Sequence, residues 1–282
     1  MHAVILAAGR ARRIGDIGRN LPKCLLEIDG RSLIEYSLEN LVRGGISKIT
    51  IVTGHCDGSI QQAFGDNFHG VPILYKYNPH YETTGSVLSL LVGARTEETG
   101  DLVVVESDIL YHPRFIEEVL NATATTIMVA DASGSGDEVF ICSAPDDRLC
   151  YLGKAATASR RQQSLGEFAG ITRLSAGFCR IYKQWAQRLS DEGKADGHYE
   201  ELIFALARTG LEVRVKHCPS VAWTEVDTPE DLDRARNIIY PQLRHFWAGG
   251  RHADQPYQSL TRHDRTSSLN VSATQIQAKN PT

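Results

Sequence analysis

The feature that most constrains the fold of this chain stands near its start, where an apolar run leads directly into small and basic residues. Residues 4–6 (Val-Ile-Leu) suit a strand that is buried on both faces of a parallel sheet. Residues 7–9 (Ala-Ala-Gly) are small enough for a ligand to approach the backbone. The loop that follows carries Arg10, Arg12, Arg13 and Arg19 and is closed by Pro22 and Lys23. Backbone N–H groups and cations together favour a polyphosphate, so the sequence predicts a triphosphate-binding loop.

Two common phosphate-binding motifs are absent from this loop. GxxxxGK[ST] is excluded because Lys23 lies between Pro22 and Cys24, and GxGxxG is excluded because Ala11 stands where its second glycine would be. The alternative is an arginine-rich solvated loop. The ordered succession of small residues, Arg13 and Pro-Lys favours the ligand site.

Composition limits the remaining possibilities. A chain of 282 residues can bury a full core, and one α/β domain plus a tail accounts for it. The 30 Lys and Arg against 34 Asp and Glu give a net charge of −4, which predicts neither a nucleic-acid nor a membrane partner. No apolar run approaches the ~20 residues of a membrane span, and the chain opens directly on a strand, without a signal peptide. We expect a cytoplasmic protein with six reduced cysteines.

The next segments predict a strand–helix–strand unit. Residues 33–42 have helical apolar spacing, and residues 49–52 (Ile-Thr-Ile-Val) form a second strand, which implies a right-handed parallel unit. A dinucleotide-binding protein would place an acidic residue after this strand, for the ribose. Here Thr53, Gly54 and His55 follow, which counts against an NAD oxidoreductase.

Polar residues also follow the third predicted strand, residues 71–75. They are Asn78, Thr84, Gly85 and Ser86, the last of which opens a helix over residues 86–94. The carboxyl ends of parallel strands are where α/β proteins bind ligands. Thr84 and Ser86 can instead serve as helix caps, and both roles can coexist.

Two carboxylate groups stand after strands that are far apart in the sequence. The apolar strand 102–106 is followed by Ser107 and Asp108, and a buried aspartate is costly unless a cation meets it. Asp108 can alternatively cap the helix that begins near Pro113, and Glu106 can support it from the same strand face. Residues 221–227 alternate in polarity, so Trp223, Glu225 and Asp227 share one face of a strand. The carboxylate at the end of the buried strand predicts a divalent cation at Asp108.

The middle and end of the chain carry weaker signals. Residues 126–130 predict a strand and residues 133–137 (Ser-Gly-Ser-Gly-Asp) a turn, and a hairpin then leads to Gly153-Lys154 and a loop over a site. Beyond Tyr240 the apolar periodicity ends, so residues 241–282 are expected to be a polar, disordered tail.

Three of these blocks resemble the sugar-nucleotidyltransferase-like (GT-A-type) family, in its phosphocholine and phosphonate cytidylyltransferase branch. Residues 6–13 with Pro22-Lys23 resemble L-A-A-G-x-G-x-R followed by P-K, with Ala11 in place of a glycine. The segment from Asn78 resembles N-x-x-(F/Y/W)-x-x-T-(N/G)-x-x-x-S-L, and residues 223–232 resemble W-x-(D/E)-x-D-T-P-E-D-L. The resemblance covers about residues 1–240.

This resemblance implies a fold and a set of roles. The fold is α/β, a single three-layer Rossmann-like nucleotidyltransferase domain over residues 1–240 with a twisted, mostly parallel sheet. Arg13 would hold the β- and γ-phosphates, Lys23 would bridge the α-phosphate and the acceptor, and Lys154 would lie near the α-phosphate. The implied nucleotide-binding residues are Leu6, Ala7, Ala8, Gly9, Asn78, Thr84, Gly85 and Ser86. The implied ligands of Mg²⁺ are Asp108, Glu225 and Asp227, and the implied acceptor-binding residues are Glu167, Tyr199, Glu200 and Trp223.

The expected activity is the transfer of CMP from CTP to a small phosphate or phosphonate acceptor, of the phosphocholine or 2-aminoethylphosphonate type. An aromatic and acidic stretch at residues 199–201 suits an ammonium group, although the same residues also suit a first helical turn. Alternatives are a sugar-1-phosphate or polyol-phosphate acceptor, UTP in place of CTP, and a catalytically silent regulatory subunit with the same fold. Retention of Arg13, Lys23, Asp108 and Asp227 together argues against the silent subunit.

Overall fold

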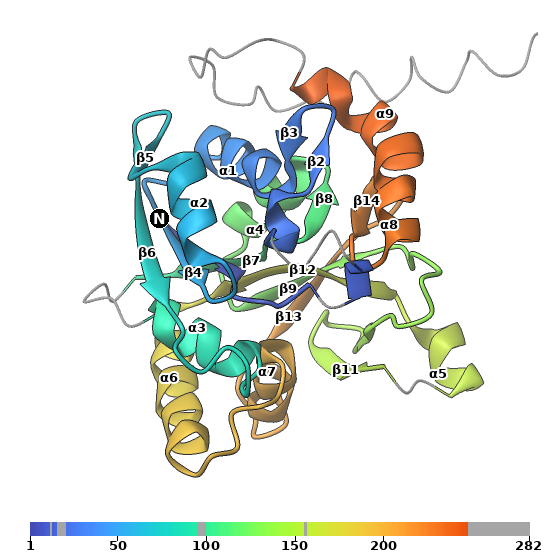
Figure 1. Ribbon diagram of the computed structural model, residues 1–282. Coiled ribbons are helices and arrows are strands. Elements are labelled where there is room, and N and C mark those ends of the chain that lie inside the picture. The colour runs from blue at the N-terminus through green and yellow to red at the C-terminus, as the bar shows by residue number, and fades with distance from the viewer. Residues whose placement is uncertain (12, 16–20, 95–99, 155–156, 248–282) are drawn as a thin grey trace, which may run out of the picture.

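The structure is a computed structural model that describes residues 1–11, 13–15, 21–94, 100–154 and 157–247 (Figure 1). Arg12 and Arg19 of the predicted phosphate loop lie outside the described residues, and so do residues 248–282 of the predicted tail.

Four parallel strands form the centre of the main sheet, in the order β6, β4, β1, β7. They are β1 (His2–Ala7), β4 (Lys48–Thr53), β6 (Val71–Tyr77) and β7 (Leu102–Glu106). Along β1, Val4 and Leu6 pack into one core cluster while Ala3 and Ile5 pack into the other. Both faces of the strand are therefore buried, which explains why its sequence is apolar throughout.

The strand order creates a switch point beside β1. The chain proceeds outward from β1 to β4 and β6, and then returns to place β7 on the other side of β1. The connections on the two sides of β1 therefore diverge, and a crevice opens beyond the carboxyl ends of β1 and β7. The predicted phosphate loop follows β1, and the predicted metal carboxylate Asp108 follows β7.

The sheet continues beyond β7 as a mixed sheet. β12 (Gly166–Leu174) pairs antiparallel with β7, and β9 (Thr126–Ala130), β10 (Phe140–Ser143) and β11 (Leu149–Gly153) extend it. β13 (Arg214–Cys218) joins β9 in parallel, and β5 (Asn67–Phe68) pairs with β6 at the opposite edge. Short pairs are made by β2 (Glu27–Ile28) with β3 (Arg31–Ser32), and by β8 (Ile109–Tyr111) with β14 (Trp223–Glu225). The predicted Rossmann-like sheet, parallel at its centre, is confirmed.

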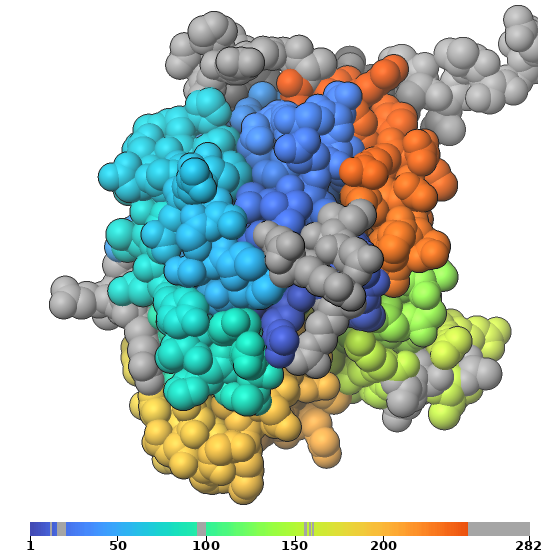
Figure 2. Space-filling view, in the orientation of Figure 1, coloured from blue at the N-terminus to red at the C-terminus, as the bar shows by residue number. Residues whose placement is uncertain are grey.

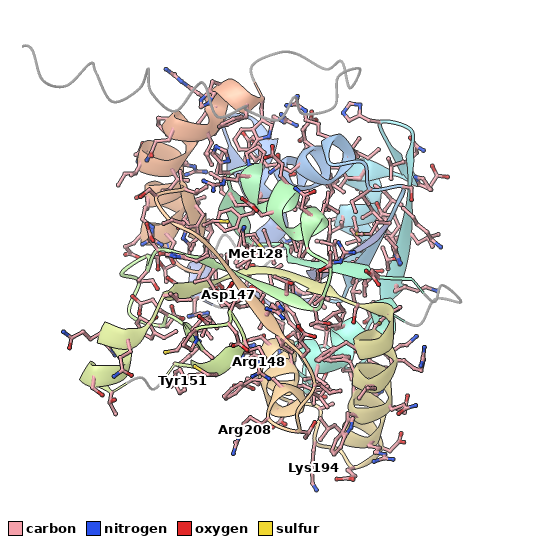
Figure 3. The ribbon with its side chains drawn as sticks, turned by 180° about the vertical axis from the view of Figure 1, so that it is seen from behind. Met128, Asp147, Arg148, Tyr151, Lys194 and Arg208 are labelled. Carbon is pink, nitrogen blue, oxygen red and sulfur yellow. The ribbon has the colours of Figure 1, made fainter. Side chains whose placement is uncertain are left out.

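Helices cover both faces of the sheet, as Figure 1 and the view from behind in Figure 3 show. On one face lie α1 (Leu33–Arg43), α2 (Asp57–Phe64) and α4 (Arg114–Asn121). On the other lie α3 (Ser86–Ala94), α6 (Ala176–Asp191) and α7 (Tyr199–Ala207). α5 (Ala158–Gln163) contacts β10, and a single-turn 3₁₀ helix, η2 (Lys23–Leu25), carries Lys23. The three-layer prediction is confirmed. None of the helices in the described ranges is both long and apolar enough to cross a membrane.

The domain extends beyond the boundary expected after Tyr240. A helical segment follows β14 and consists of α8 (Pro229–Arg234), a π-helical turn η3 (Ala235–Ile239), α9 (Tyr240–Leu243) and η4 (Arg244–Phe246). In Figure 2 this segment, in orange, lies against the blue N-terminal segment. Leu243 is fully buried, and the indole N–H of Trp247 donates to Asn40 Oδ1 over 3.2 Å. A few buried side chains therefore anchor residues 241–247, despite their polar average composition.

Replacement of Trp247 tests whether this segment stabilises the domain. The Trp247 ring lies 4.6 Å from the ring of Tyr36, centroid to centroid, and is 8% exposed. Trp247→Ala should lower the free energy of unfolding by about 3 kcal/mol, because it removes buried aromatic packing and the donor to Asn40 Oδ1. Urea unfolding followed by circular dichroism measures the change. Trp185→Ala, at an indole that is 43% exposed on α6, should change stability by less than about 0.5 kcal/mol.

Candidate active site

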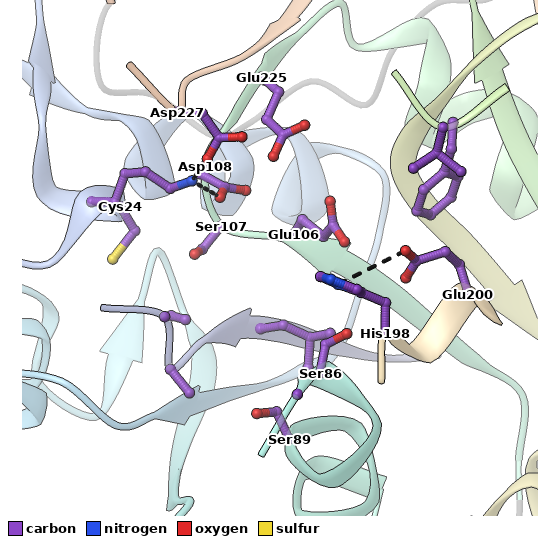
Figure 4. A pocket seen from close by; sticks show the side chains of 18 of the residues that line it. Cys24, Ser86, Ser89, Glu106, Ser107, Asp108, His198, Glu200, Glu225 and Asp227 are labelled. Atoms are coloured by element: carbon purple, nitrogen blue, oxygen red, sulfur yellow. Dashed lines mark hydrogen bonds and ion pairs between the residues drawn. The ribbon is translucent and has the colours of Figure 1, made fainter. Parts of the chain in front are cut away.

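A cavity of about 330 Å³ lies at the switch point. It brings together most of the residues that the sequence predicted for binding and catalysis. The predicted residues that line it are Leu6, Ala7, Ala8, Gly9, Arg13, Lys23, Thr84, Gly85, Ser86, Asp108, Lys154, Glu167, Glu200, Glu225 and Asp227. Segments from the start, the middle and the end of the chain therefore meet in one site (Figure 4).

Lys23 occupies the centre of the charged wall. Its ammonium forms ion pairs with both Asp108 and Asp227, and its side chain is 15% exposed. Burial alone would lower the pKa of Lys23, but the negative charges of Asp108 and Asp227 outweigh burial, and the pKa lies above its usual range. The ammonium is therefore firmly charged and neutralises two aspartates that come from different strands.

Arg13 and Lys154 are two further cationic residues that line the cavity. The Arg13 guanidinium donates to Asp227 Oδ2 over 2.6 Å and to Asp137 Oδ2 over 2.5 Å. The Lys154 ammonium lies 3.7 Å from the same Asp137 oxygen. Sequence reasoning missed Asp137, because a single aspartate at the end of a Ser-Gly turn carries no motif and lies near Arg13 only in the folded chain.

A group of three carboxylates stands beside Lys23. One oxygen from each of Glu106, Asp108 and Glu225 lies within 4.8 Å of the others. β14 pairs antiparallel with β8, so that Glu225 faces Ile109 in the register, directly after Asp108. The N–H of Val226 also donates to the carbonyl oxygen of Asp108 over 2.9 Å. Strand pairing therefore determines the spacing of carboxylates that are far apart in the sequence.

The charges of this group repel one another. Burial, and then the negative charges of Asp108 and Asp227, raise the pKa of Glu225, while Lys23 opposes the shift. Burial, and then the charges of Glu200 and Asp108, raise the pKa of Glu106. Asp227 lies alongside but faces Lys23 and Arg13. A group of carboxylate oxygens with too few cations nearby to balance its charge suits a divalent cation such as Mg²⁺.

Glu200 and Glu167 are two further acidic residues in the wall of the cavity. Figure 4 shows Glu106 between the Asp108 group and Glu200. Glu200 is 4% exposed, and its Oε2 has no hydrogen-bond partner in the described part of the chain. Glu167 Oε2 accepts from the N–H of Ser133 over 2.7 Å, and burial raises the pKa of Glu167 to about 7. A buried carboxylate oxygen without a partner calls for a donor from a ligand.

Three predicted site residues, Asn78, Tyr199 and Trp223, do not line the cavity. Asn78 is fully buried and donates to Ser89 Oγ over 3.1 Å. Tyr199 is fully buried, and its ring packs against Phe168. The indole of Trp223 donates to the carbonyl oxygen of Asp131 over 3.1 Å, within the core. These side chains support the walls of the cavity, which corrects the expectation of direct ligand contact.

Residues 84–86 join α3 to the start of α7. Ser86 Oγ accepts from the N–H of Tyr199 over 2.8 Å, so it satisfies a terminal donor of α7, which is a different helix from its own. The N–H of Gly85 donates to the carbonyl oxygen of Ala195 over 2.9 Å. A Cβ at position 85 would lie 2.1 Å from the Gly197 carbonyl oxygen, so only glycine fits here. This junction positions Glu200, one residue beyond the Tyr199 amide.

Comparison with known families agrees with this geometry. Residues 3–175 match the MobA-like NTP transferase domain. The chain belongs to this family. The match includes the loop after β1, Asp108 and Glu167, whereas Glu200, Glu225 and Asp227 lie after it. The family expected from the sequence is confirmed.

Curated relatives share part of their length with this chain. CMP-5'-(3-aminopropyl)phosphonate synthase of Streptomyces rubellomurinus is 27% identical over 83% of this chain and 38% of its own length. CTP:phosphoglutamine cytidylyltransferase of Campylobacter jejuni is 28% identical over 47% of this chain and 53% of its own length. The chain therefore corresponds to about half or less of these proteins.

Solved structures show the same fold. CTP:phosphocholine cytidylyltransferase from Streptococcus pneumoniae has a TM-score of 0.70 at 21% identity, covering 84% of this chain and 98% of its own. The inositol-1-phosphate CTP transferase from T. maritima has a TM-score of 0.73 at 18% identity, covering 89% and 98%. The single-domain nucleotidyltransferase fold is therefore confirmed.

Replacement of Gly85 tests the junction that positions Glu200. Gly85→Ala should lower the free energy of unfolding by about 2 kcal/mol, because the added methyl group must displace the backbone at Gly197. Gly58→Ala is the matched control, since a Cβ there meets open space within α2 and alanine favours a helix. Thermal unfolding of both variants measures the difference. Equal stability of the two variants would contradict the packing described here.

Proposed function

We propose that this protein is a Mg²⁺-dependent cytidylyltransferase that joins CMP from CTP to a small phosphate or phosphonate acceptor and releases pyrophosphate. One observation carries the proposal. Lys23 and Arg13, from the loop after β1, contact aspartates that follow β7 and β14 within a single cavity. CTP use is further supported by relatives and structural neighbours whose names state it.

The proposed reaction needs no side-chain nucleophile. An oxygen of the acceptor phosphate or phosphonate attacks the α-phosphorus of CTP and forms a new P–O bond. The bond from the α-phosphorus to the oxygen shared with the β-phosphorus breaks, and pyrophosphate leaves with the electron pair. The attacking oxygen is already anionic, so no proton has to be removed. The protein therefore contributes positioning and charge stabilisation.

The three described cations of the cavity suit this positioning and charge stabilisation. Lys23, the most buried of them, would orient the α-phosphate against the acceptor oxygen. Arg13, whose side chain is 55% exposed, would hold the β- and γ-phosphates as they become pyrophosphate. Lys154, which lies near the same Asp137 oxygen as Arg13, would neutralise charge near the α-phosphate. Each group is already within reach of an anion in this structure.

The charge balance supports a role for Mg²⁺. Among the described residues, seven carboxylates line the cavity, Glu106, Asp108, Asp137, Glu167, Glu200, Glu225 and Asp227, against three cations, Arg13, Lys23 and Lys154. With every one of these groups counted as ionised, they carry four more negative charges than positive ones, and the raised pKa values of Glu106, Glu167 and Glu225 reflect burial together with this excess. A triphosphate adds further negative charge. Asp108, Glu225 and Asp227, with Glu106 beside them, are the oxygen donors that would hold the ion. A bound Mg²⁺ would offset this charge and polarise the phosphate oxygens.

The acidic wall favours an acceptor that carries a primary ammonium group. Glu200 presents a buried oxygen without a described partner, and Glu106 lies beside it. A quaternary ammonium is usually held by several aromatic faces. Of the predicted aromatic contacts, Tyr199 is buried behind the wall. Among the described residues, Phe168, which packs against Tyr199, and Tyr81 are the phenyl rings that line the cavity. We therefore favour an aminoalkylphosphonate over phosphocholine, an order that the name of the Streptomyces relative also supports.

A substrate panel tests the proposal. Purified protein with Mg²⁺ and each of the four nucleoside triphosphates should release pyrophosphate fastest with CTP and 2-aminoethylphosphonate. Phosphocholine, 2-hydroxyethylphosphonate and a hexose-1-phosphate are the competing acceptors. Asp108→Ala should reduce turnover by about 10³-fold or more with an unchanged circular dichroism spectrum, because the phosphate charge loses its main counter-ion site.

The same panel separates the alternatives. Asp233→Asn, at an exposed residue of α8, should retain full activity. Turnover with the hexose-1-phosphate alone would favour a sugar nucleotidyltransferase. Absence of turnover with every acceptor would favour a silent regulatory subunit, and near-normal activity of Asp108→Ala would remove the metal assignment.

Replacement of Glu200 tests the acceptor assignment. Glu200→Gln keeps the shape of the side chain but removes the charge, so the KM for 2-aminoethylphosphonate should rise about 10-fold or more, with a smaller change for 2-hydroxyethylphosphonate. Steady-state kinetics at saturating CTP measure both values. Glu201→Gln is the matched control, since Gln can keep the hydrogen bond that Glu201 accepts from the N–H of His198. An equal rise for both acceptors would contradict an ammonium site.

A further inference from the structure

Asp137 contacts Arg13 and Lys154, two of the cations that bind phosphate groups in the proposed function. Its Oδ2 lies 2.5 Å from the Arg13 guanidinium and 3.7 Å from the Lys154 ammonium. Its Oδ1 accepts from the hydroxyl of Ser135 over 3.1 Å. Arg13 and Lys154 come from segments far apart in the sequence, so their shared anion is a feature of the folded site alone.

Asp137 differs in position from Asp227, the other aspartate that contacts Arg13. Asp227 also pairs with Lys23 and lies beside the group of Glu106, Asp108 and Glu225, where a divalent cation would take up negative charge. Asp137 lies in the connection from β9 to β10 and is not part of that group. Although burial opposes ionisation, hydrogen bonds from Arg13 and Ser135 hold the pKa of Asp137 below its usual range. A metal ion at Asp108 would therefore leave the negative charge of Asp137 in place.

We infer that Asp137 is a competing anion, which occupies Arg13 and Lys154 in the ligand-free site and displaces pyrophosphate from Arg13 after transfer. The inference rests on the proposed function. Phosphate oxygens must break the contacts of Asp137 on entry, and Asp137 re-forms them as pyrophosphate departs. No covalent bond is made or broken in this step, because only ion pairs are exchanged.

The exposure of these groups suits a reversible exchange. The side chains of Arg13 and Lys154 are each 55% exposed, and that of Asp137 is 36% exposed. Ion pairs this exposed are weak, and a polyphosphate with several charges can replace them. The buried pairs of Lys23 have no such access to solvent, so Asp137 is the carboxylate that can leave and return without rearranging the core.

Calorimetric titration with inorganic pyrophosphate and, separately, CTP tests the inference on the full chain with Mg²⁺. Asp137→Asn removes the competing charge and should lower the Kd for pyrophosphate about three- to ten-fold. The product-inhibition constant for pyrophosphate should fall by a similar factor, and the gain should shrink at high salt. Asp137→Glu retains the charge and should bind pyrophosphate much as the parent protein does.

Asp146→Asn is the matched control. Asp146 pairs with Arg148 over 2.7 Å in the turn between β10 and β11, and neither residue lines the cavity (Arg148 is labelled in Figure 3). Its affinity for pyrophosphate should equal that of the parent protein. Weaker binding by Asp137→Asn would mean that Asp137 positions Arg13 for the phosphates, and unchanged binding would mean that it does not compete; either result overturns the inference. If the parent protein binds neither CTP nor pyrophosphate, the proposed function itself fails.

Discussion

The ammonium of Lys23, held between Asp108 and Asp227, is the interaction on which the rest of the site depends. An ammonium this buried is unfavourable without carboxylates, and two adjacent buried aspartates are unfavourable without a cation. Each partner comes from a different part of the chain, namely η2, the end of β7 and the end of β14. These ion pairs therefore connect the segment after β1 to the ends of β7 and β14 without the help of a ligand.

The surrounding charges are arranged in tiers of decreasing burial. Innermost are Lys23 with Asp108 and Asp227, and beside them Glu106 and Glu225, whose raised pKa values reflect burial and mutual repulsion. Outermost is the exposed pair of Arg13 and Asp137. Electrostatic interactions strengthen as solvent is excluded, so the inner tier is rigid and the outer tier is exchangeable. The reacting phosphate would lie at the inner tier and the departing one at the outer.

The fold and most of the cavity lining could be predicted from the sequence because their signals are local. An apolar strand, small residues and a Pro-Lys pair stand within one short stretch, and Asp108 directly follows a buried strand. What could not be predicted depends on distant contacts. Asp137 has no motif, and its meeting with Arg13 exists only in three dimensions. Likewise, the alternation along residues 221–227 placed Trp223 and Glu225 on the same strand face. It could not show that Glu225 would line the cavity while Trp223 would not.

The boundary at Tyr240 and the position of Tyr199 were misjudged for a related reason. Average polarity hides individual anchors, and Leu243 and Trp247 are buried in a cluster that includes Leu33 and Tyr36 of α1, which are far away in the sequence. A tyrosine in an acidic stretch resembles a ligand contact, yet the core beside Phe168 takes the ring of Tyr199.

The pairing of β14 with β8 has a consequence for how the protein matures. β8 follows β7 directly, but its partner strand lies more than a hundred residues later in the chain. During synthesis, the phosphate loop and Asp108 emerge early and can form the central sheet, while Glu225 and Asp227 are still to be made. A nascent chain therefore has the loop after β1 and Asp108 but not Glu225 and Asp227, and the proposed site is completed as one of the last events of folding.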